Sequence, residues 1–287
     1  MNTQAKKLRD IKTQNKNLKS KILAITSGKG GVGKSTIASN LSFVLSSRGF
    51  KVAIFDASIG LANLDIIFNV KIKSNLLNVL KGECTLEDII IEVEKNLFLI
   101  PGESGDEILN FYNEDIYSRV LENSEFLNTL DYLIIDTGSG IGKNVQTFLQ
   151  HADEVIVVTI PDPSAITDAY ALIKITSAIN QNINLIVNMA ENQKEGEFIY
   201  EKIQKVAKSN IETQFFLNYL GYICTSRDIS KSLKFRQLFS KTRPNSLPSF
   251  HLNEIVDTLV FQLENQAPIK KNKKSFGLFI KKLIENI

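Results

Sequence analysis

A glycine-rich stretch near the start of the chain places the tightest limit on its fold. The stretch reads GKGGVGKST from Gly28 to Thr36, with two glycines bracketing four residues and Lys-Ser following. The apolar run 22–26 precedes it and suits a buried strand, while residues 34–48 have the pattern of a helix. A strand, a glycine-rich turn and a helix in this order predict a phosphate-binding loop.

Each residue type in this stretch has a physical role in holding phosphate. Glycines let the backbone curl so that successive N–H groups face phosphate oxygens, and the following helix adds the positive end of its dipole. Lys34 is expected to reach the β- and γ-phosphates, and the Ser35 hydroxyl to bind Mg²⁺. A glycine-rich turn that binds nothing is the alternative, and it leaves the Lys-Ser pair and its flanking elements unexplained. The predicted phosphate-binding residues are Gly28, Lys29, Gly30, Gly31, Val32, Gly33, Lys34, Ser35 and Thr36.

The rest of the chain alternates short apolar runs with helical patterns. The runs show almost no polar alternation, which is typical of strands covered on both faces of a sheet. We predict a single doubly wound α/β domain over 21–265, with a mainly parallel sheet and helices on both faces. Strands are expected at 22–26, 51–55, 97–100, 132–136, 154–159, 183–187 and 217–223. Helices are expected near 34–48, 75–81, 85–94, 104–111, 114–129, 142–150, 164–180, 194–208 and 250–264.

Two aspartates follow predicted strands. Asp56 comes just after the second strand, and Asp136 ends an apolar run and precedes Thr-Gly-Ser-Gly. The carboxyl ends of parallel strands meet at the edge of the sheet where the phosphate loop lies, so both carboxylates are placed to serve Mg²⁺. Alternatively, each of the two aspartates could serve only to cap the turn that follows it. The predicted metal-binding residues are Ser35, Asp56 and Asp136.

The phosphate loop, DASIGLANLD at 56–65 and DTGSG at 136–140 together resemble the MinD/ParA family of ATPases. Lys29 matches an additional lysine of that family, which reaches across a dimer interface to the partner's ATP; otherwise it would be a solvated loop charge. The resemblance covers about 20–265 and implies ATP or ADP with Mg²⁺ as ligands, slow ATP hydrolysis, and a homodimer linked to ATP binding. It also implies that Asn188 recognises the adenine edge and that Asp162 lies in the base and dimer-contact region.

One position departs from the family pattern. Ser58 stands where the family normally has an aspartate that orients or activates the hydrolytic water. A serine hydroxyl is a poor general base, and losing such a base typically removes about 10²–10⁴-fold in rate. We therefore expect ATP binding to survive and hydrolysis to be impaired. The residues that the resemblance assigns to catalysis are Lys29, Lys34, Asp56, Ser58 and Asp136.

Positive charge is concentrated at the two ends of the chain. Residues 1–21 carry +6 and residues 264–287 carry +4, which leaves −7 on the body of a chain whose net charge is +3. Residues 1–20 lack a sustained apolar face and are interpreted as a flexible extension. Residues 266–287 combine a lysine run with apolar residues at helical spacing from Phe276 to Ile287. Such a segment predicts an amphipathic anchor on anionic membrane; a terminal helix docked on its own domain is the alternative.

A narrower resemblance comes from the N-terminal segment and from one loop. The segment Gln4–Arg9 resembles the part of the flagellar FlhG branch (also FleN or YlxH) that engages the GTPase FlhF, and PDPSAITDAYA from Pro161 is similar to the same branch. This implies a switch for flagellar number and placement, with FlhF and basal-body or transcription components as partners. It also implies a cytoplasmic protein that attaches peripherally to the inner membrane when ATP is bound.

Other functions remain as alternatives. These are a MinD-type regulator of division sites, a ParA-type partition protein and a scaffold that senses ATP without turnover. A ParA-type protein would need a basic dimer face, which a body of −7 does not support, so no specific nucleic-acid partner is expected. An iron–sulfur reductase of a related type would need suitably placed cysteines, and Cys84 and Cys224 do not match; they are typical of free thiols in a reducing compartment.

Deleting residues 270–287 tests the predicted anchor. The truncated chain should sediment with liposomes containing phosphatidylglycerol at least about tenfold less than the full chain, because it loses both the apolar stripe and the lysines. Liposomes of neutral lipid are the control, and the full chain should bind them weakly. Equal sedimentation of both chains with the anionic liposomes would contradict the anchor.

Overall fold

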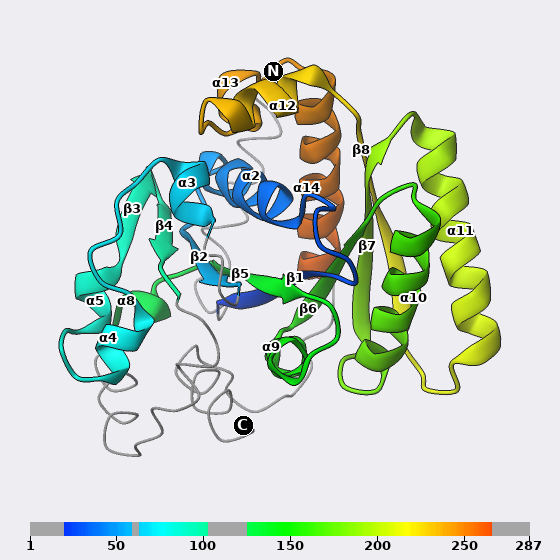
Figure 1. The fold of residues 1–287 in the computed structure, drawn as a ribbon, viewed down its shortest axis with the longest axis horizontal. Helices are drawn as coiled ribbons and strands as arrows, with labels where there is room; N and C mark the ends of the chain where they lie inside the picture. Colours follow the sequence, from blue (N-terminus) through cyan, green and yellow to red (C-terminus); the bar gives the residue numbers. More distant parts are fainter. Residues whose placement is uncertain (1–19, 59–62, 103–124, 266–287) are drawn as a thin grey trace.

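The computed structural model describes residues 20–58, 63–102 and 125–265, and these form one layered α/β unit around a central sheet (Figure 1). The eight strands lie in the order β3-β4-β2-β5-β1-β6-β7-β8. Every neighbouring pair is parallel except β3 and β4. The predicted mainly parallel sheet is therefore confirmed. The strands are β1 (Lys21–Ser27), β2 (Val52–Ala57), β3 (Ile91–Glu94), β4 (Leu97–Ile100), β5 (Tyr132–Ser139), β6 (Glu154–Thr159), β7 (Asn182–Ala190) and β8 (Phe216–Cys224).

Helices cover both faces of the sheet, because each inner strand directs apolar side chains toward both faces. In β1, Ile22 and Ala24 join one buried cluster and Leu23 and Ile25 join the other. The first face is covered by α4 (Leu76–Leu80), α5 (Leu86–Ile89), α8 (Glu125–Asn128), α9 (Lys143–His151), α10 (Pro163–Ser177) and α11 (Gln193–Asn210). The second face is covered by α2 (Lys34–Ser47), α3 (Leu64–Phe68), α12 (Arg227–Lys234), α13 (Phe239–Thr242) and α14 (Leu247–Asn265).

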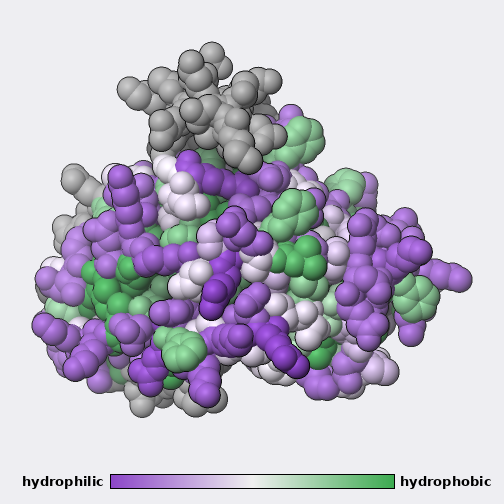
Figure 2. All heavy atoms as spheres, turned by 90° about the horizontal axis from the view of Figure 1, so that it is seen from above, coloured by the Kyte–Doolittle hydropathy of each residue, from purple (hydrophilic) through white to green (hydrophobic). Residues whose placement is uncertain are grey.

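Most of the apolar side chains are buried between these layers. Figure 2 looks onto the end of the molecule where α12 and α13 lie, and hydrophilic side chains dominate it, with hydrophobic ones in separate small groups. No helix in the described ranges combines the length and the apolar character needed to cross a bilayer.

One predicted helix is wrong. Residues 85–94 do not form a single helix: α5 ends at Ile89, and Ile91–Glu94 form strand β3, antiparallel to β4. The sequence Ile-Glu-Val-Glu alternates with a period of two, and Ile91 and Val93 pack against the core while Glu92 is exposed and Glu94 forms an ion pair with Lys241. The short helices α3, α12 and α13 were not predicted. The helix predicted at 104–111, most of the one at 114–129 and both predicted end segments lie outside the described residues.

The strand order creates the place where a ligand can bind. β1 lies between β5 and β6. After β1 the chain passes through α2 and forms β2 and β4 on one side of β1, and it later forms β6, β7 and β8 on the other side. In doubly wound folds, ligands bind beyond the carboxyl ends of the strands at such a reversal. The loop after β1 is the glycine-rich stretch.

Candidate nucleotide-binding site

A pocket of about 820 Å³ opens at this edge of the sheet. Several predicted residues of the phosphate loop line it, together with two residues from other predicted segments. They are Gly30, Gly31, Gly33, Lys34, Ser35, Thr36, Ser58 and Asn188. Segments that are far apart in the sequence thus meet around one cavity large enough for a nucleotide.

The glycines of the loop are required at particular points. Gly31 and Gly33 have φ of 81° and 85°, in the left-handed region that favours glycine. A Cβ on Gly28 would lie 2.4 Å from backbone atoms of Asp168 in α10, and a Cβ on Gly33 would lie 2.4 Å from Nδ2 of Asn188. The loop is therefore pressed between α10 on one side and the end of β7 on the other.

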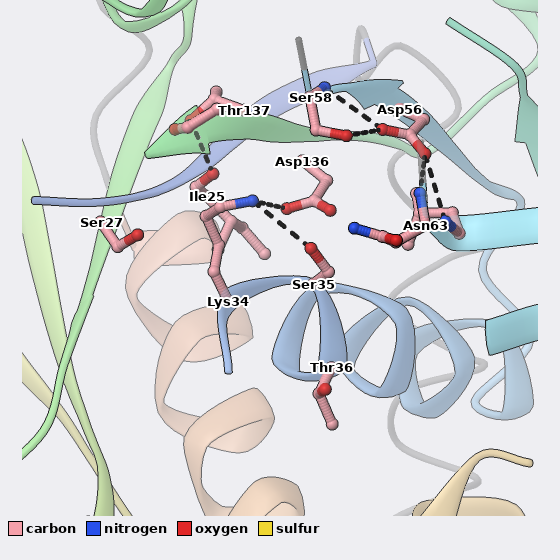
Figure 3. A network of polar contacts seen from close by, with 12 residues as sticks. Ile25, Ser27, Lys34, Ser35, Thr36, Asp56, Ser58, Asn63, Asp136 and Thr137 are labelled. Atoms are coloured by element: carbon pink, nitrogen blue, oxygen red, sulfur yellow. Dashed lines mark hydrogen bonds and ion pairs between the residues drawn. The ribbon is translucent and has the colours of Figure 1, made fainter. Parts of the chain in front are cut away.

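Lys34 forms an ion pair with Asp136 at the centre of the site (Figure 3). The lysine Nζ lies 2.5 Å from Oδ1 of Asp136 and 3.5 Å from the hydroxyl oxygen of Ser35. Both partners of the ion pair are almost fully buried. The structure thus brings the loop lysine, the following serine and the aspartate of β5 to one point.

Asp56 lies beside Asp136, because the two residues are register partners on the parallel strands β2 and β5. Its carboxylate accepts hydrogen bonds from the hydroxyl of Ser58 at 2.5 Å, from the N–H of Ser58, and from the N–H groups of Asn63 and Leu64, each at 3.2 Å (Figure 3). Burial raises the pKa of Asp56, and the hydrogen bond from Ser58 opposes that rise. Asp56 therefore also fills the turn-capping role that was the alternative interpretation.

The oxygen atoms near Lys34 differ in how well they could serve as ligands of a magnesium ion. The Lys34 ammonium group already lies within reach of the Ser35 hydroxyl and the Asp136 carboxylate, so these two oxygens converge on a positive charge. Oxygen ligands of this kind are those that Mg²⁺ prefers. Asp56 has about four acceptor sites and already accepts four hydrogen bonds, so it would act on the ion through bound water.

Lys29 lies apart from this cluster and is held within its own chain. Its Nζ lies 3.0 Å from Oδ1 of Asp162 and 2.5 Å from the hydroxyl oxygen of Ser164. Asp162 is the N-cap of α10 and also accepts a hydrogen bond from the N–H of Ala165. The hydrogen bonds from Ser164, Ala165 and Lys29 hold the pKa of Asp162 well below its usual range. The Lys29–Asp162 pair remains partly exposed to solvent.

Asn188 connects the far side of the pocket to the loop. Its side-chain N–H donates to the carbonyl oxygen of Val32 at 2.8 Å, so the residue expected to contact adenine also fixes the phosphate loop. Sequence reasoning missed several neighbours: Ser27, Asn63, Ser139, Lys143, Asn144, Met189, Ile229 and Leu233. Ile229 and Leu233 come from α12, which could have been found from its Ser226 N-cap and the four-residue spacing of these two apolar residues.

Comparison with known proteins shows which family this chain resembles. A family model, ParA, described as NUBPL iron-transfer P-loop NTPase, matches residues 18–260. The chain is 47% identical over 266 residues to the flagellum site-determining protein YlxH of Helicobacter pylori, covering 92% of this chain and 90% of that protein. It is 29% identical over 269 residues to the antiactivator FleN of Pseudomonas aeruginosa, covering 92% and 94%.

Solved structures give the same fold. MinD in the MinC:MinD complex of Aquifex aeolicus superimposes with a TM-score of 0.69 at 25% identity, covering 88% of this chain and 99% of that one. MinD of Pyrococcus horikoshii complexed with Mg-ADP gives 0.68 at 23% identity, covering 87% and 100%, and at that identity the likeness shows the fold alone.

The fold, the phosphate loop and these matches define the class: the chain belongs to the MinD/ParA family of P-loop NTPases. Within this family it is a homologue of the flagellar regulators FlhG, YlxH and FleN.

Replacing Gly28 or Gly30 by alanine tests how the loop is held. Gly28→Ala should lower the free energy of unfolding by about 1–3 kcal/mol, because its Cβ would overlap backbone of α10. Gly30→Ala is the matched control, since the nearest atom to its Cβ is 3.6 Å away and its change should stay within about 0.5 kcal/mol. Urea unfolding without nucleotide measures both. Equal effects of the two substitutions would contradict the packing described here.

Proposed function

We propose that this protein is an ATP-dependent, dimerising and membrane-associating switch that controls the number and placement of flagella. The observation that carries the proposal is the similarity to YlxH over 92% of the chain, combined with a complete phosphate loop at the sheet edge. FleN, the other flagellar relative, matches over a similar span. The fold by itself would not separate this function from those of other family members.

Nucleotide binding would rearrange the centre of the site. The N–H groups of the glycine-rich loop and the start of α2 would hold the phosphates, and Lys34 would leave Asp136 for the β- and γ-phosphates. That exchange frees the Asp136 carboxylate to join Ser35 in holding Mg²⁺, which when bound neutralises phosphate charge. Asn188 would contact the base from the end of β7, beside the apolar residues Ile229 and Leu233.

Dimerisation would depend on Lys29. In this chain Lys29 is bound to Asp162 and Ser164, so its role across an interface requires that these contacts break. The contacts are partly exposed, and exposed ion pairs contribute little free energy, so a partner's triphosphate is a strong competitor. ATP binding and dimerisation would then be thermodynamically linked.

Slow hydrolysis follows from Ser58. Its hydroxyl donates to Asp56 at 2.5 Å, so it is a hydrogen-bond donor beside a carboxylate and not a base facing water. Weak turnover would prolong the ATP-bound state. A scaffold that senses ATP without hydrolysing it is the second candidate, and this position is the observation that favours it.

Partners and location complete the proposal. The segment Gln4–Arg9 would engage the GTPase FlhF, and Phe276–Ile287 would attach the ATP-bound dimer to anionic inner membrane, where two anchors bind far better than one. The monomer would be cytoplasmic, and basal-body or transcription components are further partners. A regulator of division sites of the MinD type remains the alternative, since MinD relatives match shorter parts of the chain, such as 215 residues at 33% identity in Thermotoga maritima.

Lys29→Ala tests the switch. The variant should bind ATP but fail to dimerise with saturating ATP and Mg²⁺, because each protomer would lack the cation offered to its partner's phosphates. Analytical ultracentrifugation gives the oligomeric state, and isothermal titration gives the nucleotide affinity. Lys174→Ala, an exposed lysine of α10, should dimerise normally. An unsubstituted chain that stays monomeric with ATP, or a Lys29→Ala variant that dimerises as well as it does, would overturn the switch.

Ser58→Asp tests the turnover argument. The carboxylate would lie close to Asp56, and that like charge would raise the pKa of one of the two groups toward that of a useful base. Phosphate release should rise by about 10²–10⁴-fold over Ser58→Asn, which has the same shape without the charge. Similar rates for Ser58→Asp, Ser58→Asn and the unsubstituted chain would remove this position from the explanation.

A further inference from the structure

Lys143 is a positive charge at the pocket that the phosphate-loop pattern does not include. The pocket is lined by two lysines, Lys34 and Lys143, among the residues the structure describes. Lys34 is neutralised by Asp136, and Lys29 is occupied by Asp162 outside the lining. Lys143 is exposed, and its ammonium group forms no ion pair with any other residue in the described ranges. Among the described residues that line the pocket, Lys143 is therefore the lysine without an ion-pair partner.

The backbone holds Lys143 close to the phosphate loop. The segment that joins Asp136 to Lys143 returns to the loop, where the N–H of Gly140 donates to the carbonyl oxygen of Ser27 at 2.8 Å. The hydroxyl oxygen of Ser139 lies 3.6 Å from the position of a Cβ on Gly30. Lys143 follows three residues after Gly140 as the first residue of α9, so the positive end of that helix adds to its charge.

Glycines leave this segment free to adjust around a ligand. Gly138, Gly140 and Gly142 alternate with Ser139 and Ile141, and Gly140 has φ of 92°. Lys143 therefore lies at one end of a short glycine-rich segment, and Asp136 lies at its other end. Segments placed like this one, directly after the aspartate of an NTPase strand, respond to the terminal phosphate of the nucleotide.

We propose that Lys143 binds the γ-phosphate of ATP as a second side-chain cation beside Lys34, and so makes the site prefer the triphosphate over the diphosphate. The inference rests on the proposed nucleotide-binding function and assigns a further residue to that site. An ammonium group donating to a phosphate oxygen is a strong, charge-assisted contact. It would add a positive charge to the pocket without requiring an existing ion pair to break.

Isothermal titration of the full chain with ADP and with the non-hydrolysable analogue AMPPNP, both with Mg²⁺, tests the assignment. Lys143→Ala should weaken AMPPNP binding by about ten- to a hundredfold and ADP binding by less than about threefold. Lys143→Arg should retain most of the preference. Lys202→Ala, which removes an exposed lysine from α11, is the matched control and should change neither affinity. Thermal unfolding of each variant confirms that the fold is intact.

The outcomes separate the two proposals. Selective loss of AMPPNP affinity in Lys143→Ala supports the assignment. Unchanged affinities, or equal losses for both nucleotides, overturn it while the nucleotide-binding function stands. Failure of the unsubstituted chain to bind either nucleotide refutes the proposed function, and this assignment with it.

Discussion

The buried ion pair between Lys34 and Asp136 joins the phosphate loop to the central sheet. Lys34 begins α2 and Asp136 lies on β5, and their charged atoms are 2.5 Å apart with almost no exposure to water. Two charges taken out of water are tolerated only when each has a partner. Any anion that attracts Lys34 must therefore leave Asp136 with another cation. A phosphate bound together with a magnesium ion meets both needs at once, which makes the pair a physical reason for the two ligands to bind as a unit.

The neighbouring carboxylate has a different role although it lies on the adjacent strand. The Asp56 carboxylate accepts hydrogen bonds from the turn that follows β2. The donors are the N–H groups of Ser58, Asn63 and Leu64 and the Ser58 hydroxyl. Asp56 therefore couples the conformation of this turn to the charge at the centre of the site. Ser58 strengthens the coupling by adding a short hydrogen bond in which its hydroxyl is the donor.

Local patterns predicted most of the fold, and their failures have clear causes. The strands were found because buried parallel strands are continuous apolar runs, and the phosphate loop because its glycines and Lys-Ser pair are required in sequence. The helix predicted at 85–94 failed where a change from helical to alternating periodicity occurs within ten residues. Helix α12 was missed because it has only two apolar residues: Ile229, which packs against the core as well as lining the pocket, and Leu233, which lines the pocket and is exposed.

The sequence by itself determined the class of fold, the phosphate loop and the identity of the carboxylates near it, because each depends on residues that are close together in the chain. The tertiary structure decided what those residues touch. In the folded chain Lys29 contacts Asp162, and Asn188 donates a hydrogen bond to the carbonyl oxygen of Val32 in the loop. Lys143 and α12 lie at the pocket. Such contacts depend on the order of strands in the sheet, and strand order is set by the packing of the whole core, which no local pattern contains.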